Sequence, residues 1–295
     1  MNPLLAQLLS RAPVLTDGAW GTELQARGLK PGDFPDGWNL THPERVAEVA
    51  RAYVEAGSRI ILTNTFGANR IRLGDHGLAG RAAEINRRGV QISVQAAGDA
   101  AIVFASMGPT GKMLLTGEVT RDDLHAAFAE QAQALAEGGA RGLVIETMSD
   151  LEEAKSALAA AQPTGLPVVV CMVFDAGRDK DRTMTGATPE QVAGELTQAG
   201  ADVIGANCGV GIDRYVPVCQ RLSAATDRPI WIKANAGLPT WVDGRIVYIT
   251  TPEEFAGHVP ALVQAGARFV GGCCGTNPAF IRAIRSVTGV TEGSR

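Results

Sequence analysis

Two short segments place cysteine among glycines directly after an apolar run. Residues 271–275 read Gly-Gly-Cys-Cys-Gly and follow the run 267–270. Residues 205–209 read Gly-Ala-Asn-Cys-Gly and follow the run 202–204. Glycines on each side allow the backbone to turn sharply and to approach a ligand closely. The two segments together supply three thiols, and a sulfur-rich set of this kind favours Zn²⁺.

The three thiols of Cys208, Cys273 and Cys274 predict a catalytic zinc site, because three protein ligands leave the fourth tetrahedral position open. Adjacent cysteines have two other interpretations, a strained vicinal disulfide and a pair of small buried residues. The matching frame around Cys208 favours the metal site over both. The remaining cysteines, Cys171 and Cys219, lie inside a predicted strand and a predicted helix and are interpreted as packing residues.

A zinc ion with three thiolate ligands suits one task in particular, which is to bind a fourth thiol and keep it deprotonated. A free alkyl thiol is only about 3% thiolate at pH 7. Coordination makes that thiol essentially all thiolate, and the electron-rich site keeps it nucleophilic. The cysteine pattern therefore predicts alkyl transfer to sulfur.

Composition excludes several classes of partner. The chain has 295 residues, is 45% hydrophobic and 20% charged, and carries a net charge of −4 without a basic block, so a nucleic-acid partner is not suggested. Five cysteines without the spacing of a secreted framework indicate a reducing, cytoplasmic location. The N-terminus has no signal-peptide pattern, and no segment approaches the roughly 20 apolar residues of a membrane span.

Apolar runs alternate with amphipathic, alanine- and glutamate-rich segments along the whole chain. The runs are mostly continuous, as expected for strands buried on both faces. Strands are predicted over 13–16, 59–63, 101–106, 141–145, 167–173, 202–205, 229–233 and 268–271. Helices are predicted over 43–56, 81–97, 121–137, 151–161, 189–198, 214–225, 252–265 and 278–287.

Eight strands, each followed by a helix, predict an α/β fold of the (β/α)₈ TIM barrel type, with residues 1–295 forming a single domain. An open doubly wound sheet is the alternative fold. In a barrel the chemistry gathers at the carboxyl ends of the strands. All three of the proposed ligand cysteines would then share one rim of the barrel.

Other polar residues follow the predicted strands at the same rim. Glu146 can hold a substrate ammonium group, or it can cap a helix or form a salt bridge. Asp17 can bind substrate or cap the glycine-rich turn that begins at Gly18. Asn207 and Asn235 offer amide oxygens beside the metal, or they tie loops together.

Four segments together resemble the zinc-dependent homocysteine S-methyltransferases. They are residues 17–24 (DGAWGTEL), residues 63–66 (TNTF) and the two cysteine segments. The resemblance covers essentially the whole chain and implies a (β/α)₈ barrel with Cys208, Cys273 and Cys274 as zinc ligands. It also implies that Glu146 and the backbone around Asp17 and Gly18 hold the amino and carboxylate groups of homocysteine. Asn235 resembles an asparagine that this family places near the metal.

The resemblance leaves the methyl donor open. Residues 106–111 and 234–242 look most like the homocysteine-binding domain of methionine synthase, for which a corrinoid- or folate-binding protein would have to act in trans. Trp38 falls where betaine enzymes of this family place a tryptophan against the donor. An aromatic face attracts a methylated cation by roughly 0.5–2 kcal/mol. The alternative is that Trp38 packs a long loop.

The sequence thus predicts a cytoplasmic enzyme that methylates homocysteine to methionine at a zinc-bound thiolate, with a betaine- or sulfonium-type donor. One alternative is the homocysteine-binding subunit of a split methionine synthase that depends on cobalamin or folate. The other is a non-enzymatic barrel that binds thiols or stores zinc.

Overall fold

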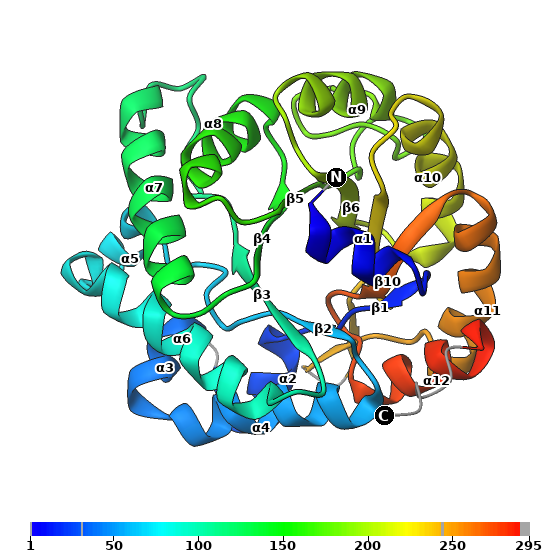
Figure 1. The fold of residues 1–295 in the computed structure, drawn as a ribbon, viewed down its shortest axis with the longest axis horizontal. Helices are drawn as coiled ribbons and strands as arrows, with labels where there is room; N and C mark the ends of the chain where they lie inside the picture. The colour runs from blue at the N-terminus through cyan, green and yellow to red at the C-terminus, as the bar shows by residue number, and fades with distance from the viewer. Residues whose placement is uncertain (1, 31, 243–244, 290–295) are drawn as a thin grey trace.

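The computed structural model describes residues 2–30, 32–242 and 245–289, and it contains a barrel of eight parallel strands surrounded by helices (Figure 1). The strands are hydrogen-bonded in the order β1-β10-β7-β6-β5-β4-β3-β2. Their bounds are β1 Val14–Leu15, β2 Ile60–Ile61, β3 Ile102–Met107, β4 Gly142–Met148, β5 Val168–Met172, β6 Val203–Cys208, β7 Ile230–Ala234 and β10 Ala267–Gly272.

The two edges of this sheet meet, which closes the barrel. The Arg59 N–H donates to the Leu15 carbonyl at 2.8 Å, and the Arg59 carbonyl accepts from the Ile102 N–H at 2.9 Å. Residues at the start of β2 therefore join β1 to β3. The (β/α)₈ prediction is confirmed, and the open doubly wound alternative is wrong. The prediction of a single domain, 1–295, also includes residues 1, 31, 243–244 and 290–295, which lie outside the described residues.

The eight predicted helices form the outer layer, and each agrees with its predicted bounds to within one residue at either end. Capping explains much of this agreement. Thr188 and Thr251 each form a capping box and precede a proline in the first helical turn. The helices are α4 Pro43–Ala56, α6 Ala82–Ala97, α7 Arg121–Glu137, α8 Leu151–Ala161, α9 Pro189–Gln198, α10 Tyr215–Ala224, α11 Pro252–Gln264 and α12 Pro278–Thr288.

Several shorter elements were not predicted. The helical ones are α1 Pro3–Leu9, α2 Gly21–Ala26, α3 Trp38–Thr41 and α5 Arg70–Gly74, with the 3₁₀ turns Pro35–Gly37, Ala79–Arg81, Gln162–Thr164 and Ile212–Arg214. A separate antiparallel hairpin joins β8 Thr240–Val242 to β9 Arg245–Val247. Within the described residues, none of the helices combines the length and apolarity that crossing a bilayer requires.

Helix α1 lies across one end of the barrel and closes it (Figure 1). Leu5 and Leu8 of this helix are buried in the cluster of apolar side chains that fills the barrel interior. Cys171 belongs to the same cluster, as its interpretation as a packing residue predicted. The other members are Val14, Ile60, Leu62, Phe104, Val144, Val169, Val203, Trp231 and Phe269.

The alternation of side chains along the strands positions a polar layer above this apolar interior. Successive side chains of a strand point to opposite faces, so residues two apart point the same way. Phe104, Val144 and Trp231 fill the interior, and two residues further on stand Ser106, Glu146 and Lys233. This polar layer is at the carboxyl ends of the strands, opposite the end that α1 closes.

Gly205 of β6 provides a test of the barrel packing. A Cβ atom at this position would lie 2.1 Å from the Trp231 carbonyl oxygen and 2.9 Å from the Cys171 Sγ. We expect Gly205→Ala to lower the free energy of unfolding by about 1–3 kcal/mol, because the backbone of β7 must move. Gly194→Ala is the matched control, since Gly194 lies on the exposed face of α9 with open space around it. Chemical denaturation of both variants measures this free energy, and equal stabilities would contradict the close contact of Gly205 with the backbone of β7.

Candidate functional site

The structure brings the three predicted ligand cysteines together at the barrel rim. Cys208 ends β6, and Cys273 and Cys274 directly follow β10. The three Sγ atoms lie within 4.8 Å of one another, and those of Cys208 and Cys274 are 4.0 Å apart. Zn–S bonds of about 2.3 Å in a tetrahedron place the sulfurs about 3.8 Å apart. All three cysteines are free thiols, so the vicinal disulfide is not the arrangement that the structure contains.

The three thiols share their protons unequally. Hydrogen bonds from Cys273 and Cys274 lower the pKa of Cys208 to about 3. The pKa of Cys273 rises to about 11, chiefly because its thiol donates to Cys208. The pKa of Cys274 rises well above its ordinary value, chiefly because this thiol also donates to Cys208. One thiolate that accepts from two thiols is a suitable arrangement for binding a metal cation, because the cation replaces the protons of the two thiols when it binds.

Backbone hydrogen bonds join the loops that carry these cysteines. The Cys273 N–H donates to the Ala234 carbonyl at 2.7 Å, and the Ala236 N–H donates to the Cys274 carbonyl at 3.0 Å. A third bond, of 3.3 Å, runs from the Asn235 N–H to the Cys208 carbonyl. The neighbouring strands β6, β7 and β10 therefore hold the thiols in one place.

The two predicted asparagines lie beside the thiols. Asn207 is fully buried, and its side chain accepts from the Thr147 N–H and donates to the Thr147 hydroxyl, both at 2.7 Å. Its amide nitrogen is also 3.7 Å from the Cys273 Sγ. These contacts support the interpretation that Asn207 ties loops together, since they join the ends of β4 and β6.

Asn235 has one buried polar atom without a partner. Its amide nitrogen donates to the Gly209 carbonyl at 2.6 Å, and its Oδ1 has no hydrogen-bond partner among the described residues. The side chain also lies close enough to Cys208 to lower the pKa of that thiol. Three soft sulfur donors with an unpartnered buried oxygen beside them fit a metal ion.

Backbone strain accompanies this arrangement. Thr147 and Cys208 have φ angles of 61° and 66°, a left-handed conformation that costs a residue other than glycine about 1–3 kcal/mol. The Asn207 side chain, which bonds to Thr147, precedes Cys208 directly. Non-glycine residues in this conformation concentrate at functional sites.

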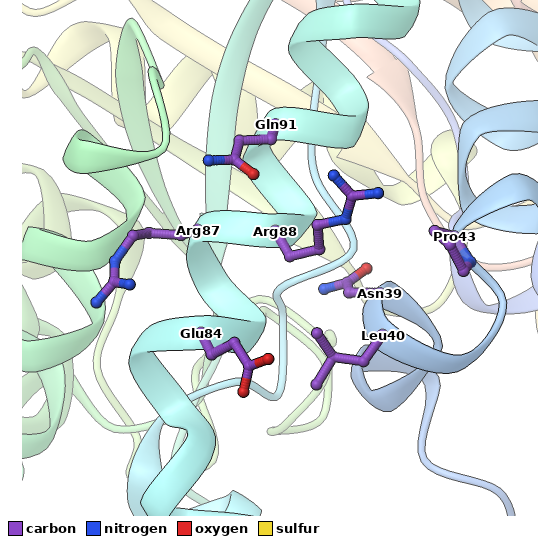
Figure 2. A pocket seen from close by; sticks show the side chains of 7 residues that line it. All are labelled: Asn39, Leu40, Pro43, Glu84, Arg87, Arg88 and Gln91. Atoms are coloured by element: carbon purple, nitrogen blue, oxygen red, sulfur yellow. The ribbon is translucent and has the colours of Figure 1, made fainter.

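A pocket of about 800 Å³ opens over the thiols at the carboxyl ends of the strands. The lining residues used below are Gly18, Trp20, Asp36, Phe66, Ser106, Glu146, Cys208, Lys233, Tyr248, Cys273 and Cys274. A smaller pocket of about 320 Å³ lies outside the barrel (Figure 2). Helix α6 and the α3–α4 segment form it from Asn39, Leu40, Pro43, Glu84, Arg87, Arg88 and Gln91, and none of the predicted site residues lines it.

Glu146 lines the main pocket as an almost buried carboxyl group, with 8% of the residue exposed. Its Oε1 accepts from the Ser106 hydroxyl at 2.5 Å. Burial raises the pKa of Glu146 to about 7, although the nearby charge of Lys233 acts in the opposite direction. A carboxylate of this kind gains from a cationic partner, so its placement suits an ammonium group.

The Asp17 carboxylate is directed into the protein and does not line the pocket. Asp17 is fully buried, and its Oδ1 forms an ion pair with the Lys233 ammonium. Its Oδ2 accepts from the Trp20 indole N–H at 2.8 Å and from the Leu62 N–H at 2.7 Å. All these contacts are internal, so the structure corrects the expectation that this carboxylate is available to substrate. The backbone at Gly18 does line the pocket.

Trp38 also lies away from the pocket. Only 7% of the residue is exposed, and its ring stacks on His42 with centroids 4.5 Å apart. The short helix α3 turns the side chain into the main hydrophobic core. Trp38 is not among the residues that line the pocket, so the structure favours the alternative interpretation, in which Trp38 packs the loop. Trp20, Phe66 and Tyr248 are the aromatic residues among those that line the pocket.

Sequence reasoning missed Lys233, Ser106 and Tyr248. Alternation from the buried Trp231 and Phe104 is a signal that could have placed the first two in the polar layer. Tyr248 follows the β8–β9 hairpin, and no sequence pattern marks it. A Cβ at Gly275 would lie 2.1 Å from the Tyr248 ring, so this glycine allows the ring to approach the cysteine loop. Burial and the charge of Cys274 raise the pKa of Tyr248 to about 12.

The fold and the site together define a closed (β/α)₈ barrel that carries three free thiols and a buried carboxyl group at the carboxyl ends of its strands. The chain belongs to the homocysteine S-methyltransferase family, a family of enzymes, because the profile of that family matches residues 14–288.

Individual relatives agree with this assignment. The chain is 31% identical over 296 residues to methionine synthase of Mycobacterium tuberculosis and 29% identical over 299 residues to that of Mycobacterium leprae. The matches cover 95% of this chain but 25% and 24% of those proteins, so the chain spans about a quarter of their length. The fold is similar to that of the metallated homocysteine methyltransferase MmuM from Escherichia coli, with a TM-score of 0.82 and 24% identity over 97% of this chain and 100% of that one.

The thiol cluster leads to a prediction about metal content. We expect the purified protein to bind about one Zn²⁺ per chain, and Cys208→Ser, Cys273→Ser and Cys274→Ser each to lose most of it, because a three-ligand site cannot spare a ligand. Cys219→Ser is the control, since the Cys219 thiol is buried in α10 and contacts carbonyls of α11 and the residue that follows it. Elemental analysis by mass spectrometry measures the metal, and a serine variant that keeps it would exclude that residue from the ligand set.

Asp36 at the pocket leads to a prediction about pH. Burial raises the pKa of its carboxyl group from 3.8 to about 7, although the Gly67 N–H donates to it at 2.9 Å. The folded protein therefore holds a proton that the unfolded chain releases at lower pH, and stability falls as pH rises from about 4 to about 7.

We expect Asp36→Asn to remove up to about 4 kcal/mol of this pH dependence, which corresponds to the shift of about three pKa units. Asparagine still offers an oxygen acceptor to the Gly67 N–H, so the difference in stability between the two proteins reports the ionisation of the Asp36 carboxyl group. Denaturant unfolding of both proteins from pH 4 to pH 8 is the measurement, and parallel curves would show that Asp36 does not titrate in this range.

Proposed function

We propose that this chain transfers a methyl group to the sulfur of homocysteine, forming methionine, at a Zn²⁺ ion held by Cys208, Cys273 and Cys274. The observation that carries the proposal is the convergence of these thiols with Glu146 in one pocket of about 800 Å³. Membership of the homocysteine S-methyltransferase family supports it. The chemical reason is that thiolate ligands make a site suited to activating a further thiol.

A bound Zn²⁺ would supply the electrostatic stabilisation that keeps the substrate sulfur as a thiolate near neutral pH. The residues of the chain would then bind and orient the substrate. Glu146 accepts the ammonium group of homocysteine, and the Ser106 hydroxyl fixes one of its oxygens. Asn207 and the backbone bonds between β6, β7 and β10 keep the cysteine loops in position, so that the sulfur and the methyl carbon meet in line.

The proposed donor is a small betaine- or sulfonium-type compound. The sulfur attacks the methyl carbon, and the bond from that carbon to the donor nitrogen or sulfur breaks with its electron pair, which leaves the donor neutral at that atom. Trp20, Phe66 and Tyr248 line the pocket and support this choice. Aromatic faces attract methylated cations by about 0.5–2 kcal/mol and have no lone pair that competes for the methyl group.

A second candidate function follows from the relatives. They are named methionine synthases, and this chain spans about a quarter of their length. Residues 1–295 would then bind and activate homocysteine, and the methyl group would come from a corrinoid or folate bound outside these residues.

A panel of donors distinguishes these functions. The zinc-loaded protein is incubated with homocysteine and, in turn, with betaine, S-methylmethionine, S-adenosylmethionine and methylcobalamin, and methionine is quantified by mass spectrometry. We expect turnover with a betaine- or sulfonium-type donor and none in Cys208→Ser. Turnover with methylcobalamin alone would favour the second candidate. Homocysteine binding without turnover by any donor would favour either a subunit of a split system, which needs its own donor protein, or a thiol-binding barrel.

A further inference from the structure

Lys233 is a buried ammonium group at the main pocket that the proposed reaction does not use. The residue is 1% exposed, belongs to β7 and lines the pocket. Its one hydrogen-bond acceptor among the described residues is the Asp17 carboxylate. An ammonium group has three N–H donors, so two of them have no protein acceptor there.

The position of this ammonium group follows from the strand order. Lys233 pairs in register with Gly271 of β10, the strand that separates β7 from β1. A Cβ at Gly271 would lie 2.0 Å from the Thr16 Oγ1 and 2.5 Å from the Asp17 carbonyl oxygen. Because residue 271 is glycine, β10 places no side chain between Lys233 and β1. The lysine side chain therefore reaches the Asp17 carboxylate at the far side of β10.

Two groups of opposite charge thus line one pocket. The Lys233 ammonium and the Glu146 carboxylate influence each other's pKa, but no ion pair joins them in the described part of the chain. Burial alone would lower the pKa of Lys233, and the charges of Asp17 and Glu146 hold it above its ordinary value. The lysine is therefore a cation with unused donors, separate from the carboxylate that suits an ammonium group.

We propose that Lys233 binds the α-carboxylate of the substrate in addition to the backbone at Gly18, which lines the same pocket, so that Lys233 and Glu146 together select zwitterionic amino-acid thiols over thiols that carry only one charge. This inference rests on the proposed function, because it assigns the binding of the same substrate. A buried cation gains most from a partner of opposite charge that accepts its remaining hydrogen bonds. An α-amino acid carries both of the charges that these two residues complement.

Binding of three small thiols distinguishes the contact made by Lys233 from the contact made by Glu146. Homocysteine carries both groups, 4-mercaptobutanoate carries only the carboxylate, and 3-mercaptopropylamine carries only the ammonium. Dissociation constants for the zinc-loaded full chain are measured by calorimetry. We expect Lys233→Met to weaken homocysteine and 4-mercaptobutanoate by about tenfold to a hundredfold, the effect of losing one charge-assisted hydrogen bond, and to leave 3-mercaptopropylamine nearly unchanged.

Glu146→Gln provides the complementary measurement. It should weaken homocysteine and 3-mercaptopropylamine and leave 4-mercaptobutanoate nearly unchanged. Lys155→Met is the matched control for loss of a lysine, because Lys155 pairs with Glu152 and Glu195 on the outer surface. This control should bind all three thiols as the wild type does.

Removing Lys233 alone leaves the Asp17 carboxylate buried without its cation, which can destabilise the fold. The double variant Asp17→Asn/Lys233→Met removes both charges together, and it should show the same selective loss as Lys233→Met. Asp17→Asn alone keeps the ammonium group and should retain the preference for thiols that carry a carboxylate. Zinc content and thermal unfolding are recorded for each variant.

The outcomes separate the two proposals. If both Lys233 variants bind the three thiols as the wild type does, or lose all three equally, the carboxylate contact is overturned while the proposed function stands. If the zinc-loaded wild type binds no homocysteine, both proposals are overturned. Selective loss of the two carboxylate-bearing thiols supports the contact, because a purely structural role would not distinguish the ligands.

Discussion

The buried ion pair between Asp17 and Lys233 joins the part of the barrel where backbone pairing is weakest. Strands β1 and β2 contain two residues each, and they meet where the sheet closes. The Asp17 carboxylate contacts Lys233 of β7 and accepts from the Leu62 N–H directly after β2. Removing one partner of such a pair typically costs about 3–5 kcal/mol, because the other charge stays buried. One carboxylate thus ties three strands together beneath the pocket.

The cysteine loops above this pair depend on rigid neighbours. Cys208 and Thr147 adopt left-handed backbone conformations, and the Asn207 side chain makes two hydrogen bonds to Thr147. Strained residues of this kind persist only where surrounding contacts hold them. The thiols are therefore positioned before a ligand arrives, which suits a centre that must bring a sulfur and a methyl carbon into line.

The polar layer of the barrel gives the pocket its particular charge. The apolar interior ends at Phe104, Val144 and Trp231, and the inward positions above them are Ser106, Glu146 and Lys233. A (β/α)₈ barrel as such does not require charged side chains there, since the fold itself is stabilised by the apolar layers. Family membership therefore accounts for the architecture, and the residues of this layer give the pocket both an ammonium group and a carboxyl group.

The sequence by itself determined the order of the barrel elements, the bounds of the eight outer helices and the shared rim of Cys208, Cys273 and Cys274, whereas β4 and β6 each extend three residues beyond their predicted ends. These features follow from local signals, namely continuous apolar runs, threonine caps such as Thr188 and glycines beside the cysteines. The tertiary structure decided three other features. They are the burial of Trp38, the pairing of Asp17 with a lysine 216 residues away, and the closure of one end of the barrel by α1. Each of these features depends on contacts between residues that are far apart in the sequence, and local sequence patterns do not predict such contacts.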